Sequence, residues 1–550
     1  MMNLESLIKL VVKGSATAGV LLLTACQTTN YQKLDISEEV KDPTPDQILI
    51  DQAPELLNSK ELESLLRHKD KVTEASLKAD RLFNSAFIDN SHYRSNGLPQ
   101  HNLDPLLGPS IRLSTWNIEK SIHVNKAAEA LSAEESFIEH LSSRALKNKR
   151  VYSKAVRQRA TLAASDILLL QEIDIGHCRS DYLFAAQKLA HKMGMNYVYA
   201  PQQLEIDPVY LGVDNIEFGN KAVDHRTCKL DQEGVEEYRG VFGVAVLSRY
   251  PIKRVEVFPL KNQPYDWYDR EIVKPDILEE TRRFGAQTLF KAKPLREVKY
   301  GGRGFTRVDL HVPDVPHETI SVINVHLEIK AEPKRRVEQL TEILSYISDI
   351  ENPVVMAGDF NSASRDLSAT SIIRAASRAA KDPWNLTSAG LFLLDVTGVY
   401  QLRNLVNGVK NFQDPLAIGV PLILPNKKKS LFKLIENYRF KDGGAFDFRG
   451  DAKRSINGSP KVLSNSNQRS LFKGFTNTFS VPKPIGPIGR DRLDWIFVKS
   501  FLNHPKAKDG PYKLAPHFGE TLNLMNTAVK SKYSDHHPIT TIIPLTEPKL

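Results

Sequence analysis

The sequence contains little cysteine, and beyond its first residues it has no long apolar run. Only three of its 550 residues are cysteines, and none lies in a C-x-x-C pair or at a Cys/His spacing typical of a zinc site. No later stretch is long and apolar enough to span a bilayer, and no repeat of solenoid length recurs. These absences argue against a zinc module, a multi-span membrane protein and a solenoid.

The composition is that of an ordinary globular protein. Hydrophobic residues make up 41% of the chain and charged residues 25%, and the length is ample for a large core. The 74 Lys and Arg residues exceed the 65 Asp and Glu residues, so the formal net charge is +9. A moderate basic excess suits a polyanionic partner or an anionic surface.

The N-terminus has the pattern of an export signal. Lys9 and Lys13 precede an apolar run over residues 16–23, which is too short to span a bilayer. We therefore expect residues 1–26 to be a signal peptide. An uncleaved membrane anchor is the alternative.

The end of this segment resembles the lipobox of bacterial lipoproteins. It reads Leu-Thr-Ala-Cys and closes at Cys26, the position at which such proteins are cleaved and lipidated. The resemblance implies a lipid-anchored protein of the bacterial cell envelope. Gln27, where an aspartate would signal retention, implies the outer membrane, facing the periplasm or the exterior.

The two remaining cysteines are Cys178 and Cys228. An oxidising periplasm permits a disulfide between them. Two buried free thiols are the alternative, and the sequence does not decide between the two.

The rest of the chain divides by composition. Polar residues 27–60 are predicted to be a tether, and residues 61–110 a helical extension with apolar positions at helical spacing. The main domain is predicted at 111–545, with inserts at about 205–240 and 366–485.

Within the main domain, apolar strands alternate with helices. Strands are predicted at "IRLSTWNIEK", "DILLLQEID", "GVAVLSRYPI", "TISVINVHLEI", "NPVVMAGDFN" and "RLDWIFV". A basic, alanine-rich stretch at 121–164 reads as helical, and Val337, Leu340 and Leu344 form the apolar stripe of another helix. Strands separated by helices over this length indicate a layered α/β architecture.

One strand ends in an unusual way. In "MAGDFNSAS" the apolar run gives way to Asp359 and Asn361 on either side of Phe360. A turn is the simple interpretation, because Gly, Asp, Asn and Ser are turn formers. The alternative is the edge of an active site. On an extended chain Asp359 and Asn361 would share one face, and Phe360 would point into the core.

Other predicted strands also end in polar residues. Each has a simple structural explanation alone, but together they form a set rich in oxygen ligands, with two imidazoles and no thiolate. Such a set suits Mg²⁺ or Mn²⁺ rather than zinc. The residues are Asn117, Glu119, Glu172, Asn324, His326, Asp359, Asn361, Asp494, Asp535 and His536.

The order of these motifs resembles the endonuclease/exonuclease/phosphatase superfamily, which includes the DNase I-like nucleases, neutral sphingomyelinases and inositol-polyphosphate phosphatases. The elements are W-N-I-E, L-Q-E, L-S-R, N-V-H-L, G-D-F-N, R-L-D-W and S-D-H-H-P, and they cover roughly residues 110–365 and 487–545. The resemblance implies a DNase I-like four-layer α/β sandwich, in which two packed β-sheets are flanked by helices. Because the two inserts lie beside the motifs, the resemblance leaves the substrate undecided.

The resemblance also implies roles for the residues. Glu172 would hold a divalent ion, with Asn117, Glu119 and Asp535. Asp359 would orient or deprotonate the attacking water, and Asn361 would donate hydrogen bonds to the phosphate. His536, oriented by Asp494, would face the scissile phosphate. His326 would stabilise charge or protonate the leaving oxygen.

The resulting hypothesis is a Mg²⁺- or Mn²⁺-dependent phosphoester hydrolase. Nucleic acid is slightly favoured as substrate by the basic balance and by the Lys/Arg-rich segment 145–158, which otherwise is a solvated helix face. A phospholipid or sphingomyelin substrate suits the expected membrane tether. A non-catalytic envelope scaffold is the alternative of another class, and the full set of polar residues argues against it.

Overall fold

The computed structural model describes residues 48–105, 107–206, 236–272, 297–362, 429–447, 475–485, 488–499 and 517–545. The expected signal peptide, Cys26 and Cys228 lie outside these residues, as do most of the predicted tether and most of both predicted inserts. No helix among the described residues is long and apolar enough to cross a membrane.

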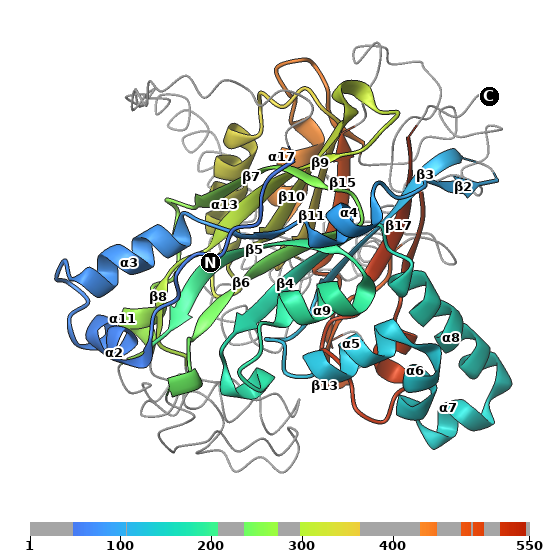
Figure 1. Cartoon of the computed structure of the whole chain (residues 1–550), viewed down its shortest axis with the longest axis horizontal. Helices are drawn as coiled ribbons and strands as arrows, with labels where there is room; N and C mark the ends of the chain where they lie inside the picture. Colours follow the sequence, from blue (N-terminus) through green and yellow to red (C-terminus); the bar gives the residue numbers. More distant parts are fainter. Residues whose placement is uncertain are drawn as a thin grey trace, which may run out of the picture. The chain divides into compact units, whose positions relative to one another are not determined.

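The larger of two main sheets has nine strands (Figure 1). Its path runs through β1 (Phe87–Asp89), β5 (Asn196–Glu205), β6 (Val241–Ser248), β4 (Ile167–Ile175), β3 (Gly108–Asn117), β17 (Ile539–Pro544) and β16 (His517–Thr521), while β2 (Asn102–Asp104) pairs with β3 and β8 (Lys299–Gly301) with β5. The central strands β3 and β4 are parallel, so their carboxyl ends lie at the same edge.

The second sheet has six strands in the order β12 (Phe446–Asp447), β15 (Asp494–Lys499), β11 (Val354–Asp359), β10 (Thr319–His326), β9 (Gly304–His311) and β7 (Ile252–Pro259). Strands β10 and β11 are parallel, and β15 runs antiparallel to β11. A separate ribbon joins β13 (Phe479–Ile485) to β14 (Ile488–Asp491).

The two main sheets pack face to face, and the alternation of side chains along each strand explains the apolar runs in the sequence. In β4, Leu169 lies in the core between the sheets, while Leu168 and Leu170 lie in the core on the outer face. In β11, Val355 lies between the sheets and Met356 on the outer side. A strand buried on both faces needs apolar residues at both parities.

Helices cover both outer faces, which confirms the predicted four-layer sandwich. The core outside the larger sheet includes α5 (Val124–Ser132), α6 (Glu134–His140), α8 (Lys149–Ala163) and α9 (Ala185–Met193), while α13 (Pro333–Tyr346) and α17 (Lys429–Asn437) pack outside the second sheet. The described residues also include α4 (Ser91–Asn96), α7 (Ser143–Lys147), α11 (Trp267–Glu271) and α18 (Leu524–Thr527), with short 3-10 turns at Cys178–Ser180 and Pro316–Glu318.

The N-terminal extension belongs to the same body as the sheets. Helices α2 (Ser59–Arg67) and α3 (Glu74–Phe83) contribute Leu62, Leu65 and Leu82 to the outer core. The tether was predicted to extend to residue 60, but the packed structure begins before that residue. Leu57 is already fully buried, and Asn58 caps α2. Hydrophobic burial at Leu57 is what draws this stretch onto the fold.

The predicted insert at 366–485 is also not a single excursion from the fold. Leu431, Phe432 and Ile435 of α17 are buried against the second sheet, and the Phe432 ring lies 4.5 Å from that of Trp495. Strand β12 extends the same sheet by pairing with β15. The mixed composition of the surrounding sequence gave no sign of this helix.

Candidate active site

Three polar side chains lie in one row across the second sheet. His326, Asp359 and Asp494 stand at the ends of β10, β11 and β15, and the strand registers pair His326 with Asp359 and Asp359 with Asp494. Residues paired across strands project from the same face. The register therefore brings together three residues that are far apart in the sequence.

The larger sheet faces this row with the end of β3. Asn117 Nδ2 donates a hydrogen bond of 3.1 Å to Asp359 Oδ2 and another of 3.1 Å to Glu172 Oε1. Asn324, one of the predicted strand-end residues, also joins the sheets, since its amide donates to the carbonyls of Leu170 and Ala245. Asn324 thus holds the sheets together, behind the row.

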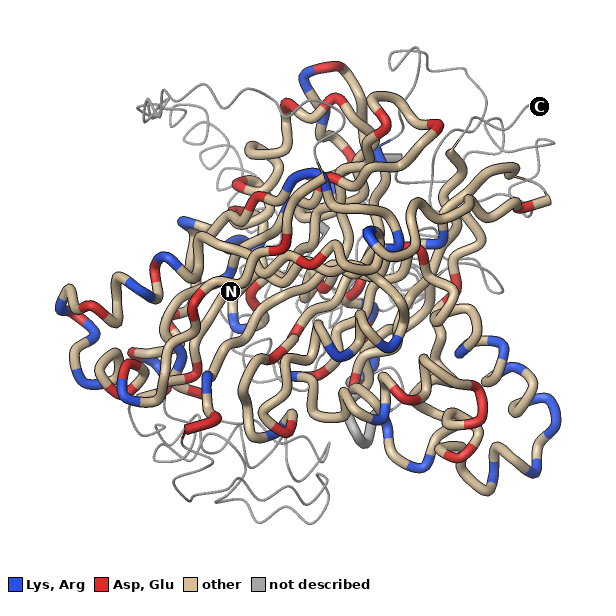
Figure 2. The backbone as a smooth tube through the Cα atoms, viewed as in Figure 1, with Lys and Arg blue, Asp and Glu red and all other residues tan. Residues whose placement is uncertain are grey.

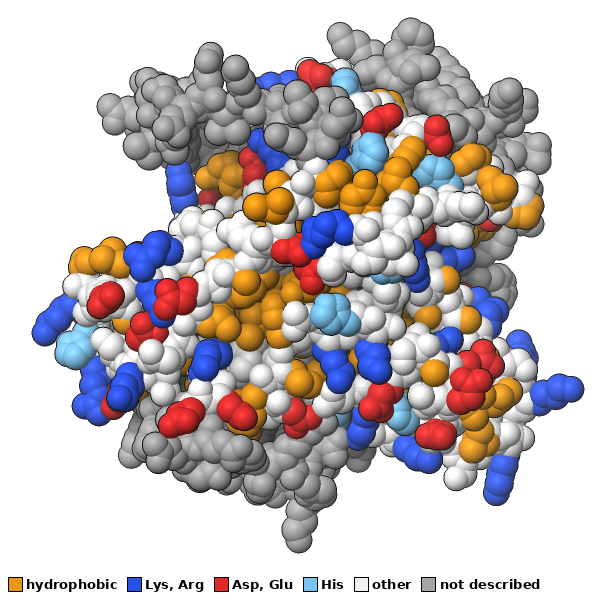
Figure 3. Space-filling model, viewed as in Figure 1, with side chains coloured by type: hydrophobic (Ala, Val, Ile, Leu, Met, Phe, Trp, Pro, Cys, Tyr) orange, Lys and Arg blue, Asp and Glu red, His pale blue; other side chains and the backbone are white. Residues whose placement is uncertain are grey.

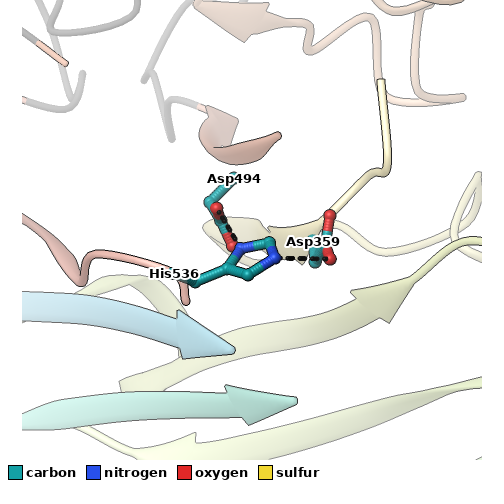
Figure 4. Close-up of side chains that lie close together, drawn as sticks. All are labelled: Asp359, Asp494 and His536. Carbon is teal, nitrogen blue, oxygen red and sulfur yellow. Dashed lines mark hydrogen bonds and ion pairs between the residues drawn. The ribbon is translucent and has the colours of Figure 1, made fainter. Parts of the chain in front are cut away.

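His536 closes the row by joining its two carboxylates (Figure 4). Its Nδ1 lies 2.9 Å from Asp494 Oδ2, and its Nε2 lies 3.9 Å from Asp359 Oδ2. Asp494 and Asp359 are both about 1% exposed at the side chain, and His536 is 6% exposed. Because the Asp494 carboxylate accepts the Nδ1 proton, His536 presents Nε2 towards Asp359.

His326 approaches Asp359 from the other side. Its Nε2 lies 3.8 Å from Asp359 Oδ2 and 3.8 Å from Glu172 Oε1. Its Nδ1 accepts a 2.8 Å hydrogen bond from Arg303 Nη1. A guanidinium can only donate, so Nε2 carries the proton of the neutral ring. Burial, together with the charge of Arg303, holds the pKa of His326 well below its ordinary value.

Three carboxylates lie beside this row and are half-buried. Glu172 sits at a bulge of β4 with a φ of 58°, which turns its side chain out of the alternation of the strand. Glu119 follows β3 with a φ of 47°, and its Oε2 accepts a 2.9 Å hydrogen bond from the backbone nitrogen of Asp535. The backbone at both positions is in the left-handed region, which serves here to aim a carboxylate.

The electrostatics show that these carboxylates oppose one another. Burial raises the pKa of Glu119 to about 8, with repulsion from Asp535 and Glu172 adding to the rise. Burial also raises the pKa of Asp535. Burial pushes the pKa of Glu172 upwards too, but Lys120 and Asn117 outweigh it, so that pKa is lowered. Lys120 is itself ion-paired with Glu297.

This donor set fits a divalent cation. Glu119, Glu172 and Asp535 supply only oxygen ligands, they repel one another, and they are reached from solvent. Such groups suit Mg²⁺ or Mn²⁺. Asp359, Asp494 and His536 also lie close enough together to be considered as ligands. However, the hydrogen bond between Asp494 and His536 uses the Nδ1 atom, so we interpret these residues as a proton-handling pair beside Asp359.

The pKa values of Asp359 and His536 are shifted in a useful direction. Burial raises the pKa of Asp359 to about 7, with His536 opposing the rise. Burial disfavours the His536 imidazolium, but Asp494, Asp359 and Asp535 outweigh it and raise the pKa well above its ordinary value. His536 is therefore a charged donor at neutral pH, whereas His326 is a neutral one.

The local geometry around Asp359 differs from the prediction. Strand β11 ends at Asp359, and Asn361 has a φ of 45°, so the two residues do not share a face of an extended chain. Instead the Asn361 backbone nitrogen donates a 2.7 Å hydrogen bond to Asp359 Oδ1, and its side-chain nitrogen donates to the Leu327 carbonyl at 2.8 Å. The turn and the site edge coexist. Phe360 is fully buried, as predicted.

The structure links all nine predicted catalytic and metal-binding residues through direct contacts. They are Asn117, Glu119, Glu172, His326, Asp359, Asn361, Asp494, Asp535 and His536. Of the cysteines, Cys178 is disulfide-bonded, while Cys228 and Cys26 lie outside the described residues.

Several supporting residues escaped the sequence analysis. The carbonyl of His536 accepts hydrogen bonds from Trp116 Nε1 at 3.0 Å and from Asn526 Nδ2 at 2.6 Å. Ser534 Oγ accepts from the His536 backbone nitrogen at 2.9 Å and donates to the Asn117 carbonyl at 2.7 Å. Ser534 begins the S-D-H-H-P element, which was a usable signal. Asn526 carried none.

Arg303 was missed for a different reason. It stands in a Gly-Gly-Arg-Gly stretch, and its Nε donates to Glu328 Oε2 at 3.1 Å. Trp267 Nε1 donates to the same oxygen at 2.9 Å. Nothing in the sequence connected this glycine-rich stretch to an imidazole.

The sequence profile of the Endonuclease/Exonuclease/phosphatase family matches residues 114–536. No curated protein matches the chain.

Among solved structures, an endonuclease/exonuclease/phosphatase from Beutenbergia cavernae is 16% identical, with a TM-score of 0.36, and the match covers 80% of this chain and 72% of that one. The human Nocturnin catalytic domain with bound sulfate is 13% identical, with 80% and 95% covered and a TM-score of 0.33. A 3′ phosphatase from Neisseria bound to a product DNA hairpin is 15% identical, with 78% and 98% covered and a TM-score of 0.31.

Proposed function

The chain belongs to the endonuclease/exonuclease/phosphatase family, and on that premise we propose that it is a divalent-metal-dependent phosphodiesterase acting on nucleic acid. The observation that carries the proposal is the row of His326, Asp359 and Asp494, closed by His536 and set beside three carboxylates that repel one another. This arrangement combines a cation site, a proton acceptor and two imidazole donors.

Glu119, Glu172 and Asp535 would hold the metal ion. When bound, Mg²⁺ supplies positive charge that neutralises the phosphate and its developing charge. Asn117 positions one of these ligands, because its amide donates to Glu172 while its other hydrogen bond reaches Asp359. One side chain therefore couples the spacing of the metal site to that of the proton acceptor.

Asp359 accepts the proton of the attacking water. A pKa of about 7 makes Asp359 a stronger base than an ordinary carboxylate, while it remains largely ionised above neutral pH. The Asn361 backbone nitrogen and the Asn117 amide fix the orientation of its two oxygens. Fixed orientation matters because a proton acceptor works only within hydrogen-bond reach of the water.

The two imidazoles stabilise the negative charge of the phosphate. His536 donates from Nε2 as an imidazolium held by Asp494, and His326 donates from Nε2 as a neutral ring held by Arg303. The sequence left open whether His326 stabilises charge or protonates the leaving oxygen. Because Arg303 occupies Nδ1 and disfavours the charged ring, we favour charge stabilisation.

The test compares four substrates with one catalytic variant and one control. The full chain is assayed with Mg²⁺ on plasmid DNA, RNA, sphingomyelin and bis-p-nitrophenyl phosphate, beside Asp359→Asn and Glu351→Gln. Glu351 precedes the opposite end of β11 and is exposed. Nucleic-acid cleavage that disappears with EDTA and with Asp359→Asn, but not with Glu351→Gln, supports the proposal.

Two outcomes contradict it. Turnover of sphingomyelin alone would replace nucleic acid by phospholipid as the substrate. Inactivity on all four substrates, with no Mg²⁺-dependent rise in melting temperature, would favour the non-catalytic scaffold.

We also propose that Cys26 carries lipid and anchors the protein to the outer membrane. The support is the lipobox-like end of residues 1–26. Labelled palmitate should be incorporated into the protein expressed in a bacterial host and lost in Cys26→Ser. Equal labelling of both proteins would contradict this proposal.

A further inference from the structure

The second half of the segment between β3 and β4 carries an excess of positive charge. From Leu141 to Ser165 there are seven Lys and Arg residues and no Asp or Glu. This segment contains α7, α8 and the short turns at their ends. An exposed helix usually intersperses both signs of charge, and α13 illustrates this with its Arg335–Glu338 ion pair.

Two of the seven cations have structural partners. Arg157 is paired with Glu520 at 2.8 Å, and the buried guanidinium of Arg159 donates to the carbonyls of Ala130 and Leu131. The other five are exposed, and none forms an ion pair with a described residue. We call these five the basic face: Arg144, Lys147, Lys149, Arg150 and Lys154. Figure 2 shows Lys and Arg positions along α7 and α8, and Figure 3 shows basic side chains at the surface on this side of the molecule.

The placement of two of these charges does not serve helix stability. Lys149 and Arg150 occupy the first turn of α8, which contains no acidic residue, and the last turn contains no basic one. The helix dipole disfavours cations at an N-terminus and favours them at a C-terminus. The arrangement in α8 is the reverse, so this positive charge is not explained by the stability of the helix.

The basic face is tied to the segment that carries the site. The Ser142 backbone nitrogen donates to the Ala528 carbonyl at 2.8 Å, and the Lys530 backbone nitrogen donates to the His140 carbonyl at 2.9 Å. The Tyr533 hydroxyl lies 2.8 Å from His140 Nδ1. Ser534, Asp535 and His536 follow directly. The α6–α7 junction and the catalytic segment are thus held as one unit.

More positive charge lies along this connection. Lys530 and Lys532 are exposed and stand between the α6–α7 junction and Asp535. The charge of Lys532 acts on Asp535, where it lowers the pKa against the effect of burial. The lysines therefore continue the positive surface from the basic face towards the acidic cluster.

A hydrophilic polyanion fits this surface better than a membrane does. Between residues 141 and 165 the only large hydrophobic side chain that is exposed is Leu146. Surfaces that insert into lipid combine cations with several exposed apolar residues. Nucleic acid needs only cations that neutralise regularly spaced phosphates.

We propose that the basic face binds the sugar-phosphate backbone of a nucleic acid strand whose scissile phosphate lies at the row of His326, Asp359 and Asp494. The proposal rests on the proposed function for the position of the scissile phosphate. It adds the surface that holds the strand outside the site. Because this surface contacts phosphates only, binding is independent of base sequence.

The test measures binding without turnover. In an Asp359→Asn background with EDTA, the affinity for a fluorescent oligonucleotide is followed by anisotropy across a salt series. The variant is Lys147→Gln/Lys149→Gln/Arg150→Gln. The matched control removes three exposed lysines elsewhere, in Lys60→Gln/Lys71→Gln/Lys192→Gln. Each lost phosphate contact reduces the slope of log affinity against log salt by about 0.7–0.9.

The expected result is a slope smaller by about 2–3 and an affinity at least about tenfold weaker at moderate salt in the variant, with less than one unit of slope lost in the control. The variant should melt at nearly the same temperature, because it removes two cations from the first turn of α8 and one from the last turn of α7. Equal slopes in the variant and the unmodified chain would overturn the proposal.

Two further arms separate the alternatives. Binding to vesicles of phosphatidylcholine and phosphatidylglycerol in equal parts should not depend on the basic face, and a loss confined to the vesicles would replace nucleic acid by a membrane. With Asp359 unchanged and Mg²⁺ present, the variant that lacks the three basic-face cations should turn over bis-p-nitrophenyl phosphate at the normal rate. If the unmodified chain turns over nothing, the proposed function fails, while the binding series still decides whether this face contacts nucleic acid.

Discussion

Arg303 offers the sharpest test of how the site is held together. Its guanidinium is 3% exposed and joins two groups, the Nδ1 atom of His326 and the carboxylate of Glu328. Glu328 is 2% exposed and keeps two other donors, Trp267 Nε1 and the Lys330 backbone nitrogen. We predict that Arg303 is a positioning residue, because it acts through His326 and not on the substrate.

The structure sets the size of the stability effect. Arg303→Met leaves the Glu328 carboxylate buried without its counter-charge, and such a loss costs about 3–5 kcal/mol. Since two hydrogen bonds to Glu328 remain, we expect the lower end, about 3 kcal/mol. At roughly 2 °C per kcal/mol for a domain of this size, the melting temperature should fall by about 6 °C.

A second variant separates stability from positioning. In Arg303→Met/Glu328→Leu both charges of the buried pair are replaced by apolar groups, which often restores stability. The Nδ1 atom of His326 still lacks its donor, so the ring is free to adopt the other tautomer. We expect the melting temperature of the double variant to recover in part, because Trp267 Nε1 and the Lys330 backbone nitrogen lose their acceptor. Its kcat on bis-p-nitrophenyl phosphate should stay about 10- to 100-fold low.

Arg303→Lys is the conservative comparison. Lysine keeps the charge, but as a single ammonium it cannot reproduce the fork that reaches His326 and Glu328 together. We expect a smaller fall in melting temperature and a persistent loss of kcat. Recovery of both the melting temperature and kcat in the double variant would show that Arg303 is purely structural, and would refute the tautomer argument.

Three further predictions follow from other parts of the site. Burial raises the pKa of Glu119 to about 8, so between about pH 4.5 and pH 8 the metal-free folded state holds a proton that the unfolded state releases. The stability of the metal-free protein therefore falls as pH rises through this range. Mg²⁺ should raise the melting temperature more at pH 8 than at pH 5, and an equal rise at both would contradict this. Burial lowers the pKa of His537 to about 4, so the unfolded state takes up a proton first and the stability of the fold decreases as pH drops from about 6.5 towards 4. In chemical denaturation, His537→Gln should lose less of its free energy of unfolding over that pH range than the unmodified chain does. Gly358 has a φ of 138°, and a Cβ there would meet the Val325 carbonyl oxygen at 2.0 Å. Gly358→Ala should therefore lower the free energy of unfolding by about 3 kcal/mol or more. A melting temperature within a degree of the unmodified chain would exclude the clash.

Much of the fold followed from the sequence because its signals are local. The apolar runs that end at Gln171 and Asp359 are buried on both faces, and the alternation of their side chains between two cores is the reason both parities are apolar. The polar residues at those ends are conspicuous because they interrupt such runs. Their order along the chain was enough to suggest the family.

Two boundaries could not be read from composition. Residues 27–60 are polar overall, yet Leu57 is buried and Asn58 caps a helix. Helix α17 lies within a long stretch of mixed composition, yet it supplies Phe432 to the second core. In each case one or two apolar side chains decide the packing, and a compositional average hides them.

The sequence by itself determined which carboxylates and imidazoles end the buried strands, and these are residues that the structure brings together. Only the tertiary structure decided how they work together. The register of β10, β11 and β15 places Asp359 between His326 and Asp494, and the left-handed backbone of Asn361 replaces the extended chain that the sequence predicted. Arg303 reaches His326 from the connection between β8 and β9. The periodicity of a sequence records which face of each element is buried, but not which element lies across from it, and the protonation of each imidazole depends on that neighbour.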